Sequence, residues 1–78
     1  MALVEKIAHA PLERPRVHGP VDCTYTAFTE TDGRRYVQLD TYGSDVRQIK
    51  GKKSQTIQLT EEAARELVRL LKTEFRIP

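Results

Sequence analysis

Two stretches of alternating apolar and polar residues, separated by a turn signal, constrain the fold of this chain most strongly. Val21–Phe28 and Arg35–Tyr42 alternate with period two and are rich in β-branched and aromatic residues, so each predicts a strand. Asp32 and Gly33 lie between them, and glycine supplies the positive φ that a tight hairpin turn requires. The sequence therefore predicts an antiparallel hairpin in the middle of the chain.

The length of the hairpin loop decides which side of the first strand joins Val37 and Leu39. A two-residue loop would pair Phe28 with Val37, which brings the even-numbered residues of the first strand onto that face. A three-residue loop, with Gly33 in a bulge, instead brings its odd-numbered residues there. These are Val21, Cys23, Tyr25 and Ala27. We favour the three-residue loop because it builds the fuller apolar face.

The last third of the chain predicts a strand followed by an amphipathic helix. Ser54–Leu59 alternates, with Ile57 and Leu59 expected to point inward, and Thr60 is a suitable N-cap residue. Glu61 lies four residues before Arg65, the spacing of a helical ion pair. The apolar residues recur at helical spacing: Ala64, Leu67, Val68, Leu71 and Phe75.

The remaining segments are less regular. Residues 1–20 carry three prolines and are predicted to form an N-terminal arm or loop, with a short strand or a helical turn within Ala2–Ala8. Asp45–Ile49 is a candidate for a further short strand. Residues 21–78 are expected to form a single domain. The predicted fold class is α+β: a small antiparallel sheet of three or four strands followed by one C-terminal helix, which covers one face and leaves the other bare.

The chain is short, which bears on its oligomeric state and location. With 78 residues and an unpaired Cys23, it has neither a disulfide nor a zinc-binding cysteine pattern to support a small core. A partner chain is the remaining support, so a homodimer is expected. A lone cysteine is typical of reducing compartments, and no apolar run is long enough to cross a bilayer. A cytoplasmic protein with no membrane contact is expected.

Positive charge is concentrated in the middle of the sequence. The net charge is only +2, but the segment from Arg34 to Lys53 holds six basic and two acidic residues, a net +4. Such a concentration is expected of an electrostatic site for nucleic acid, although a solubilising hairpin tip is the alternative. Tyr36 and Tyr42 lie on the strand beside it, and tyrosines there either stack on bases or pack within the protein. Packing is favoured for Tyr36, whereas both alternatives stay open for Tyr42.

These observations select the candidate nucleic-acid-binding residues. They are Arg34, Arg35, Tyr42, Arg47, Lys50, Lys52 and Lys53. Lysine and arginine neutralise phosphates, and the basic turn around Gly51 leads into Ser54 and Gln55, which offer further donors to phosphate oxygens.

Three short runs carry a family resemblance. This part of the chain resembles the C-terminal single-stranded-DNA-binding domain of the transcriptional positive cofactor four family. The runs that carry the resemblance are Tyr36–Tyr42, Gly51–Ser54 and Ile57–Glu62, together with the helix that follows. The resemblance covers roughly Val21–Phe75. It implies a curved antiparallel sheet, one helix, and a homodimer whose sheets cradle single-stranded or melted DNA. The positions that it places near DNA are Arg35, Tyr42, Arg47, Lys50, Lys52 and Lys53.

A second resemblance concerns Asp40–Ser44 and Ser54–Leu59. These runs are similar to short uncharacterised bacterial proteins, some of which carry a methionyl-tRNA formyltransferase label. A chain of 78 residues is too short to hold the folate domain of that enzyme, so the resemblance does not imply this activity.

Catalytic and metal-binding patterns are not found. Asp40 and Asp45 lack the companion residues of a magnesium-dependent nuclease, and His9, His18 and Cys23 are spaced too irregularly for zinc. Cys23 is expected to be a small buried residue. No enzymatic activity, cofactor or metal is expected.

The sequence thus predicts a non-enzymatic nucleic-acid-binding protein that prefers single-stranded DNA and acts as a homodimer through a basic, tyrosine-bearing sheet face. Two alternatives stay open. A small sheet backed by one helix also suits binding to duplex DNA, in the major groove. A bare sheet face also suits a small interaction subunit of a larger protein complex.

Overall fold

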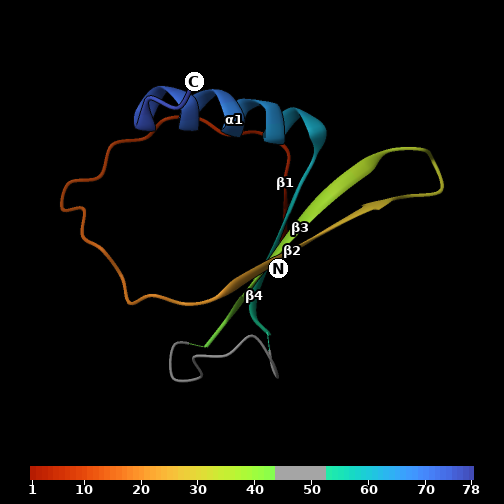
Figure 1. Cartoon of the computed structure of the whole chain (residues 1–78), viewed down its shortest axis with the longest axis horizontal. Coiled ribbons are helices and arrows are strands. Elements are labelled where there is room, and N and C mark those ends of the chain that lie inside the picture. The colour runs from red at the N-terminus through yellow and green to blue at the C-terminus, as the bar shows by residue number, and fades with distance from the viewer. Residues whose placement is uncertain (44–52) are drawn as a thin grey trace.

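The computed structural model of the chain describes residues 1–43 and 53–78. Within them the elements are β1 (Ala2–Val4), β2 (Cys23–Thr29), β3 (Arg35–Tyr42), β4 (Lys53–Leu59) and α1 (Glu61–Phe75). The strands form one sheet in the order β1-β4-β3-β2, and α1 follows β4 directly (Figure 1). The predicted α+β fold is confirmed. The candidate strand at Asp45–Ile49 lies outside the described residues.

The sheet is mixed, which corrects the expectation of a purely antiparallel one. β2, β3 and β4 pair antiparallel, but β1 pairs parallel with β4. Of the two conformations expected within Ala2–Ala8, the short strand is the one that forms. A long loop from β1 returns the chain to β2 at the opposite edge of the sheet (Figure 1). The long connection permits this parallel arrangement, since only a hairpin forces neighbouring strands to run in opposite directions.

The β2–β3 turn has the predicted three-residue loop. Glu30 N–H donates to the Arg34 carbonyl at 2.8 Å, and Gly33 N–H donates to the Glu30 carbonyl at 2.9 Å. Gly33 has a φ of 89°, in the left-handed region that glycine adopts without strain. Tyr25 consequently lies opposite Leu39 and Ala27 lies opposite Val37. The preferred register is therefore confirmed.

This register gives the sheet two chemically different faces. On the apolar sheet face, two rows of uncharged side chains cross all four strands. They are Ala27, Val37, Leu59 and Val4, and Tyr25, Leu39, Ile57 and Ala2. The polar sheet face carries the alternate residues of the same strands: Thr24, Thr26, Phe28, Tyr36, Gln38, Asp40, Tyr42, Lys53, Thr56, Gln58 and Leu3.

Both ends of α1 are capped. Thr60 Oγ1 accepts from the Ala63 N–H at 3.1 Å, which confirms the predicted N-cap. The predicted ion pair also forms, with Arg65 Nη2 at 2.6 Å from Glu61 Oε2. At the other end Arg76 adopts the left-handed conformation and donates its backbone N–H to the Lys72 carbonyl.

The helix covers far less of the sheet than expected. Within the described chain, Ala63 in the first turn is the only buried residue of α1, whereas Phe75 is 70% exposed. On the apolar sheet face Tyr25 is 75% exposed. α1 begins one residue after β4 ends, so no connecting loop turns it back along the strands. It runs instead to the side opposite the β2–β3 turn (Figure 1).

The apolar core is correspondingly small. Among the described residues, the buried apolar side chains are those of Tyr42, Leu59 and Ala63. Cys23 is exposed, so the prediction that it is buried is wrong. It lies on β2 at the edge of the sheet, two strands away from β4, which α1 contacts. In the described part of the chain, none of the helical segments has the length and apolar character needed to cross a membrane.

Candidate nucleic-acid interface

A buried carboxylate organises the centre of the polar sheet face. Asp40 is only 2% exposed, and its oxygens accept hydrogen bonds from two neighbouring side chains. Thr56 Oγ1 donates to Oδ1 at 2.6 Å, and Gln38 Nε2 lies 3.1 Å from Oδ2. Thr56 is the direct cross-strand partner of Asp40, so the strand register itself places the donor. A buried charge of this kind is tolerated because it is hydrogen-bonded and paired.

Lys53 supplies the opposite charge. Its Nζ lies 3.4 Å from Asp40 Oδ2, while 53% of its side chain stays exposed. Hydrogen bonds from Thr56 and Gln38, together with the Lys53 charge, hold the pKa of Asp40 below its ordinary value, although burial acts in the opposite direction. The carboxylate is therefore ionised at neutral pH. It holds the ammonium group of Lys53 in place, while about half of the Lys53 side chain stays exposed to solvent.

The same carboxylate orients two glutamine side chains. Because Gln38 donates its Nε2 to Asp40, its Oε1 faces β4 and accepts from Gln58 Nε2 at 2.9 Å. This fixes the amide of Gln58, whose Oε1 and second N–H make no other side-chain hydrogen bond within the described residues. A shallow concavity of about 460 Å³ is lined by these polar groups and the start of β1: Met1, Ala2, Leu3, Gln38, Lys53, Thr56 and Gln58.

Tyr42 is placed as a packing residue. Its side chain is 8% exposed, and its hydroxyl lies 3.0 Å from Thr24 Oγ1. Of the two alternatives left open for this tyrosine, the structure shows packing, so its ring offers no open surface to a base. Its place on the polar sheet face is nevertheless the predicted one.

An aromatic pair lies nearer the hairpin turn. The rings of Phe28 and Tyr36 stack with centroids 5.7 Å apart and an angle of 29° between their planes. Packing was the favoured prediction for Tyr36, and it is confirmed. Both side chains are half-buried, so part of this aromatic surface faces solvent.

Arg34 and Arg35 lie at the hairpin, away from Lys53. Arg35 Nη1 donates to Thr29 Oγ1 at 2.9 Å, and Arg34 Nε lies 3.8 Å from Asp32 Oδ2, both at exposed positions. Arg35 and Tyr42, which pairs with Lys53, are seven residues apart on β3, so about 24 Å separates the two basic ends. The structure therefore separates these basic residues: Arg35 shares the side of Val37 and Leu39, the apolar sheet face, whereas Lys53 lies on the polar sheet face.

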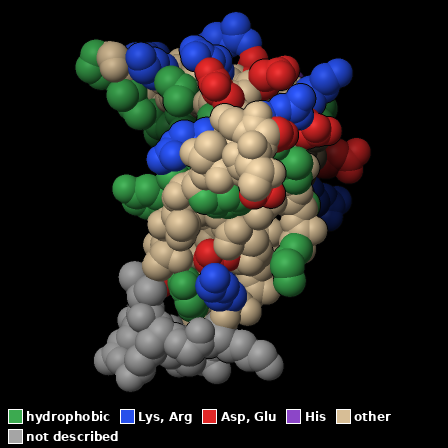
Figure 2. Space-filling view, turned by 90° about the vertical axis from the view of Figure 1, so that its right-hand side faces the viewer, with side chains coloured by type: hydrophobic (Ala, Val, Ile, Leu, Met, Phe, Trp, Pro, Cys, Tyr) green, Lys and Arg blue, Asp and Glu red, His purple; other side chains and the backbone are tan. Residues whose placement is uncertain are grey.

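The hairpin end carries mixed charge. A cleft of about 540 Å³ there is bordered by three arginines and three glutamates. They are Arg34, Arg35, Arg65, Glu5, Glu61 and Glu62. Figure 2 likewise shows acidic and basic side chains mixed around the helix and a largely uncharged surface below it. Positive charge at this end is consequently balanced within the fold.

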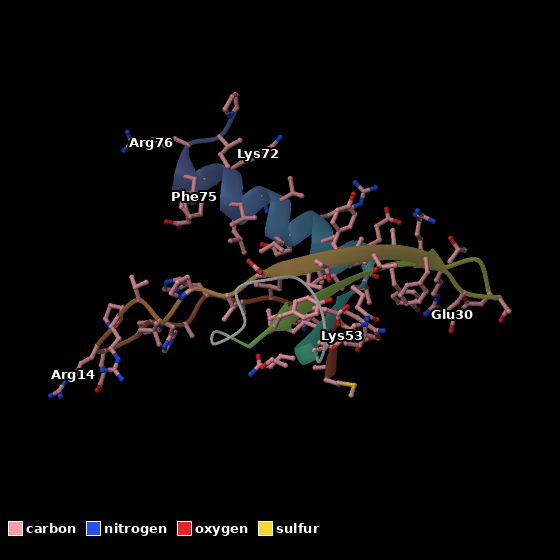
Figure 3. All side chains as sticks on the ribbon, turned by 60° about the horizontal axis from the view of Figure 1, so that its bottom comes forward. Arg14, Glu30, Lys53, Lys72, Phe75 and Arg76 are labelled. Atoms are coloured by element: carbon pink, nitrogen blue, oxygen red, sulfur yellow. The ribbon has the colours of Figure 1, made fainter. Side chains whose placement is uncertain are left out.

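Lys53 stands apart from that mixed region. Figure 3 shows it far from the end of α1 that carries Lys72, Phe75 and Arg76. The other predicted basic residues, Arg47, Lys50 and Lys52, lie outside the described residues. In the described part of the chain, no three His, Cys, Asp or Glu side chains are grouped closely enough to hold a metal ion.

Several residues of this face are not distinguished by the sequence alone. Gln38, Thr56 and Gln58 are ordinary strand residues, and Phe28 contributes to the sequence pattern only as a β-former. The signal that identifies them is the register: once Leu39 lies opposite Ile57, Gln38 must face Gln58 and Asp40 must face Thr56.

Comparisons with known proteins identify no relative. No family model, no curated protein and no solved structure matches this chain.

Proposed function

We propose that this protein is a non-enzymatic nucleic-acid-binding protein that prefers single strands and acts as a homodimer. The observation that carries the proposal is the composition of the polar sheet face. Lys53 keeps about half of its side chain exposed, and Gln58, which lines the same concavity, offers an oriented amide. Nucleic-acid interfaces usually combine two kinds of contact: lysines bind phosphates, and amide and hydroxyl groups bind bases or sugars.

The length of the face suits an extended ligand. From the row of Tyr42 and Lys53 to the row of Tyr36 and Phe28 the face extends for six residues of β3, about 20 Å, with hydrogen-bonding side chains between the two rows. A single strand laid along β3 would meet Lys53 at one end, hydrogen-bonding groups in the middle, and the Phe28–Tyr36 pair at the other end. The net +4 of the segment from Arg34 to Lys53 adds long-range attraction for phosphates.

The aromatic pair supports the preference for single strands. Unpaired bases stack on aromatic side chains, whereas bases in a duplex are already stacked on one another. Tyr36 and Phe28 replace Tyr42 in this role, because their stacked rings stay partly open. The resemblance to the positive cofactor four domain, which binds single-stranded or melted DNA, agrees with this choice.

The homodimer follows from the small core. Leu59 and Ala63 are the buried aliphatic side chains in the described residues, too few to stabilise a domain of this length alone. An apolar sheet face opposite the polar one lets two copies associate while both polar sheet faces stay outward.

Binding to a fluorescently labelled single strand and to a duplex of equal length tests the proposal. We expect tighter binding to the single strand, and Tyr36→Ala should weaken it by about 1–3 kcal/mol while changing duplex binding less. Tyr25→Ala, a tyrosine on the other face of the sheet, is the matched control and should leave the affinity per dimer unchanged.

Other outcomes select the alternatives. Tighter binding to the duplex would assign the face to duplex DNA. If the protein binds neither the single strand nor the duplex at low salt, and one stoichiometric protein partner is recovered instead, it would be an interaction subunit.

A further inference from the structure

We propose that the outer edge of β2 pairs antiparallel with the same edge of β2 in another copy of this chain, across a two-fold axis perpendicular to the sheet. The contact goes beyond the proposed function, because it joins two sheets side by side rather than face to face. It lies in the plane of the sheet and leaves the apolar sheet face free. It does not depend on what the polar sheet face binds.

The hydrogen bonds at the two ends of β2 show which of its main-chain groups point outward. At one end Tyr42 donates its N–H to the Asp22 carbonyl at 3.1 Å. At the other end Glu30 donates its N–H to the Arg34 carbonyl at 2.8 Å. Asp22 and Glu30 are both even-numbered, the register between β2 and β3 is uninterrupted, and bonded pairs alternate with non-bonded pairs along antiparallel strands. The odd-numbered residues of β2 therefore direct their N–H and C=O groups away from β3: Cys23, Tyr25, Ala27 and Thr29.

β2 lacks the features that usually protect a sheet edge. Proteins protect such an edge with a charged residue, a proline, a bulge or a very short strand. β2 lies last in the strand order and has seven residues, none of them charged and none a proline. Within the described residues, no backbone hydrogen bond outside the strand ladder reaches its outward groups. β1, at the opposite edge, has only three residues. β2 is thus the edge that can accept a further strand.

A second copy of β2 fits this edge because the strand is complementary to itself. In a two-fold contact each residue meets a residue of the same strand, so charged residues in β2 would bring like charges together, and β2 has none. One register, centred on Thr26, pairs every outward residue of one copy with an outward residue of the other. In this register Tyr25 lies opposite Ala27. Cys23 lies opposite Thr29.

The contact is closed, so it joins two sheets and goes no further. Pairing uses the β2 edge of both copies and leaves the short β1 at each outer edge. Just beyond the paired residues Asp22 of one copy meets Glu30 of the other. Arg35 donates to Thr29 Oγ1 at 2.9 Å, which brings a positive charge near these two carboxylates. The two-fold axis keeps both polar sheet faces on one side and joins them into one continuous surface.

Disulfide trapping tests the contact and its register. Thr26 lies opposite Thr26 of the other copy as a non-hydrogen-bonded pair, with Cα atoms about 4.5 Å apart, which a disulfide can span. In a Cys23→Ser background, Thr26→Cys should form a disulfide-linked pair of chains under mild oxidation. Thr29→Cys in the same background is the matched control. It is also exposed on β2, but its counterpart lies about 20 Å away along the strand, so it should not be linked.

The native cysteine supplies a second test of the register. When Cys23 is retained, Thr29→Cys should form a disulfide between residue 29 of one copy and Cys23 of the other, which peptide mapping by mass spectrometry identifies. The wild-type chain, whose Cys23 faces Thr29, should stay unlinked under the same conditions.

Two trapping results would overturn the proposal. In the Cys23→Ser background, one is equal linking of Thr26→Cys and Thr29→Cys, and the other is linking of neither. Thr26→Lys tests the contact without oxidation, because it places two ammonium groups opposite each other.

Analytical ultracentrifugation should show that Thr26→Lys weakens self-association by about tenfold. Thr31→Lys, in the hairpin turn outside the paired strand, should not, and equal effects would contradict the contact. Oligonucleotide binding is measured separately on the wild type, so its absence would reject the proposed function and leave the linked pair standing.

Discussion

At the scale of single residues, Asp40 positions the neighbouring side chains of the polar sheet face. It is buried, it accepts hydrogen bonds from Thr56 and Gln38, and it pairs with Lys53. Gln38 in turn fixes Gln58. One carboxylate therefore sets the position of the exposed ammonium and the orientation of both amides, although it offers almost no surface of its own to a ligand.

The low pKa of Asp40 makes a prediction about pH. Below about pH 4 an ordinary aspartate in the unfolded chain binds a proton, while folded Asp40 stays ionised until a lower pH. The stability that its partners contribute is therefore present above that pH and is lost as the pH falls through the folded pKa. Wild type should be more stable than Asp40→Asn at neutral pH, and the difference should shrink in acid.

Urea unfolding at a series of pH values measures this difference. Glu30→Gln, which removes one carboxylate at the hairpin tip (Figure 3), controls for the loss of a negative charge. The role given to the carboxylate would be contradicted if wild type and Asp40→Asn lost the same unfolding free energy between neutral pH and acid.

At the scale of secondary-structure elements, the hairpin turn determines which residues share a face. Gly33 holds the three-residue loop that places Ala27 opposite Val37. A loop one residue shorter would exchange the two faces of β2 and bring Phe28 to the apolar side. The division into an apolar and a polar sheet face thus depends on one left-handed residue.

Gly33→Ala tests this dependence. An alanine at φ 89° is strained, so the variant should lose about 1–2 kcal/mol of unfolding free energy. Gly19→Ala is the matched control, because a Cβ there meets no atom within 4 Å and its φ is not in the left-handed region. It should be neutral or slightly stabilising. Equal effects of the two substitutions in urea unfolding would argue against a register set by the turn.

The elements were predictable where the signal is local. The alternation of β3, the glycine of the turn and the Thr60 cap each act within a few residues, so the sequence located them well. The parallel pairing of β1 joins residues more than fifty positions apart, and no local pattern encodes it. The direction of α1 and the exposure of Cys23 depend on how elements pack, which periodicity does not report.

The candidate site was predictable in part for the same reason. Charge composition selected Lys53, whose half-exposed side chain lies on the polar sheet face and pairs with Asp40. Composition did not separate a stacking from a packing tyrosine, because that depends on the neighbours each ring meets. Tyr42 meets Thr24, whereas Tyr36 meets Phe28 next to the turn of the hairpin.

At the scale of the whole molecule, each face of the sheet is assigned a different partner in the proposed function. We propose the apolar sheet face as the surface for a second copy and the polar sheet face as the surface for nucleic acid. Because an interface would supply most of the apolar burial, folding and association should be coupled.

This coupling predicts a melting temperature that rises with protein concentration. Each tenfold increase adds about 1.4 kcal/mol to the stability of a folded dimer over unfolded chains. Tyr25→Asp, on the apolar sheet face, should lower the melting temperature, and Lys72→Ala on α1 should not. Differential scanning calorimetry over a wide concentration range measures both, and a melting temperature independent of concentration would contradict an obligate dimer.

The central claim is that the polar sheet face binds single-stranded nucleic acid by neutralising its phosphates. A salt titration of the affinity for a labelled single strand tests it most directly. The logarithm of the association constant should fall linearly with the logarithm of the salt concentration, and Lys53→Ala should reduce the slope by about 0.7 for each phosphate that this lysine neutralises. Lys72→Ala, on the far end of α1, should leave the slope unchanged (Figure 3). Absence of binding at low salt, or a slope that Lys53→Ala does not alter, would contradict the account.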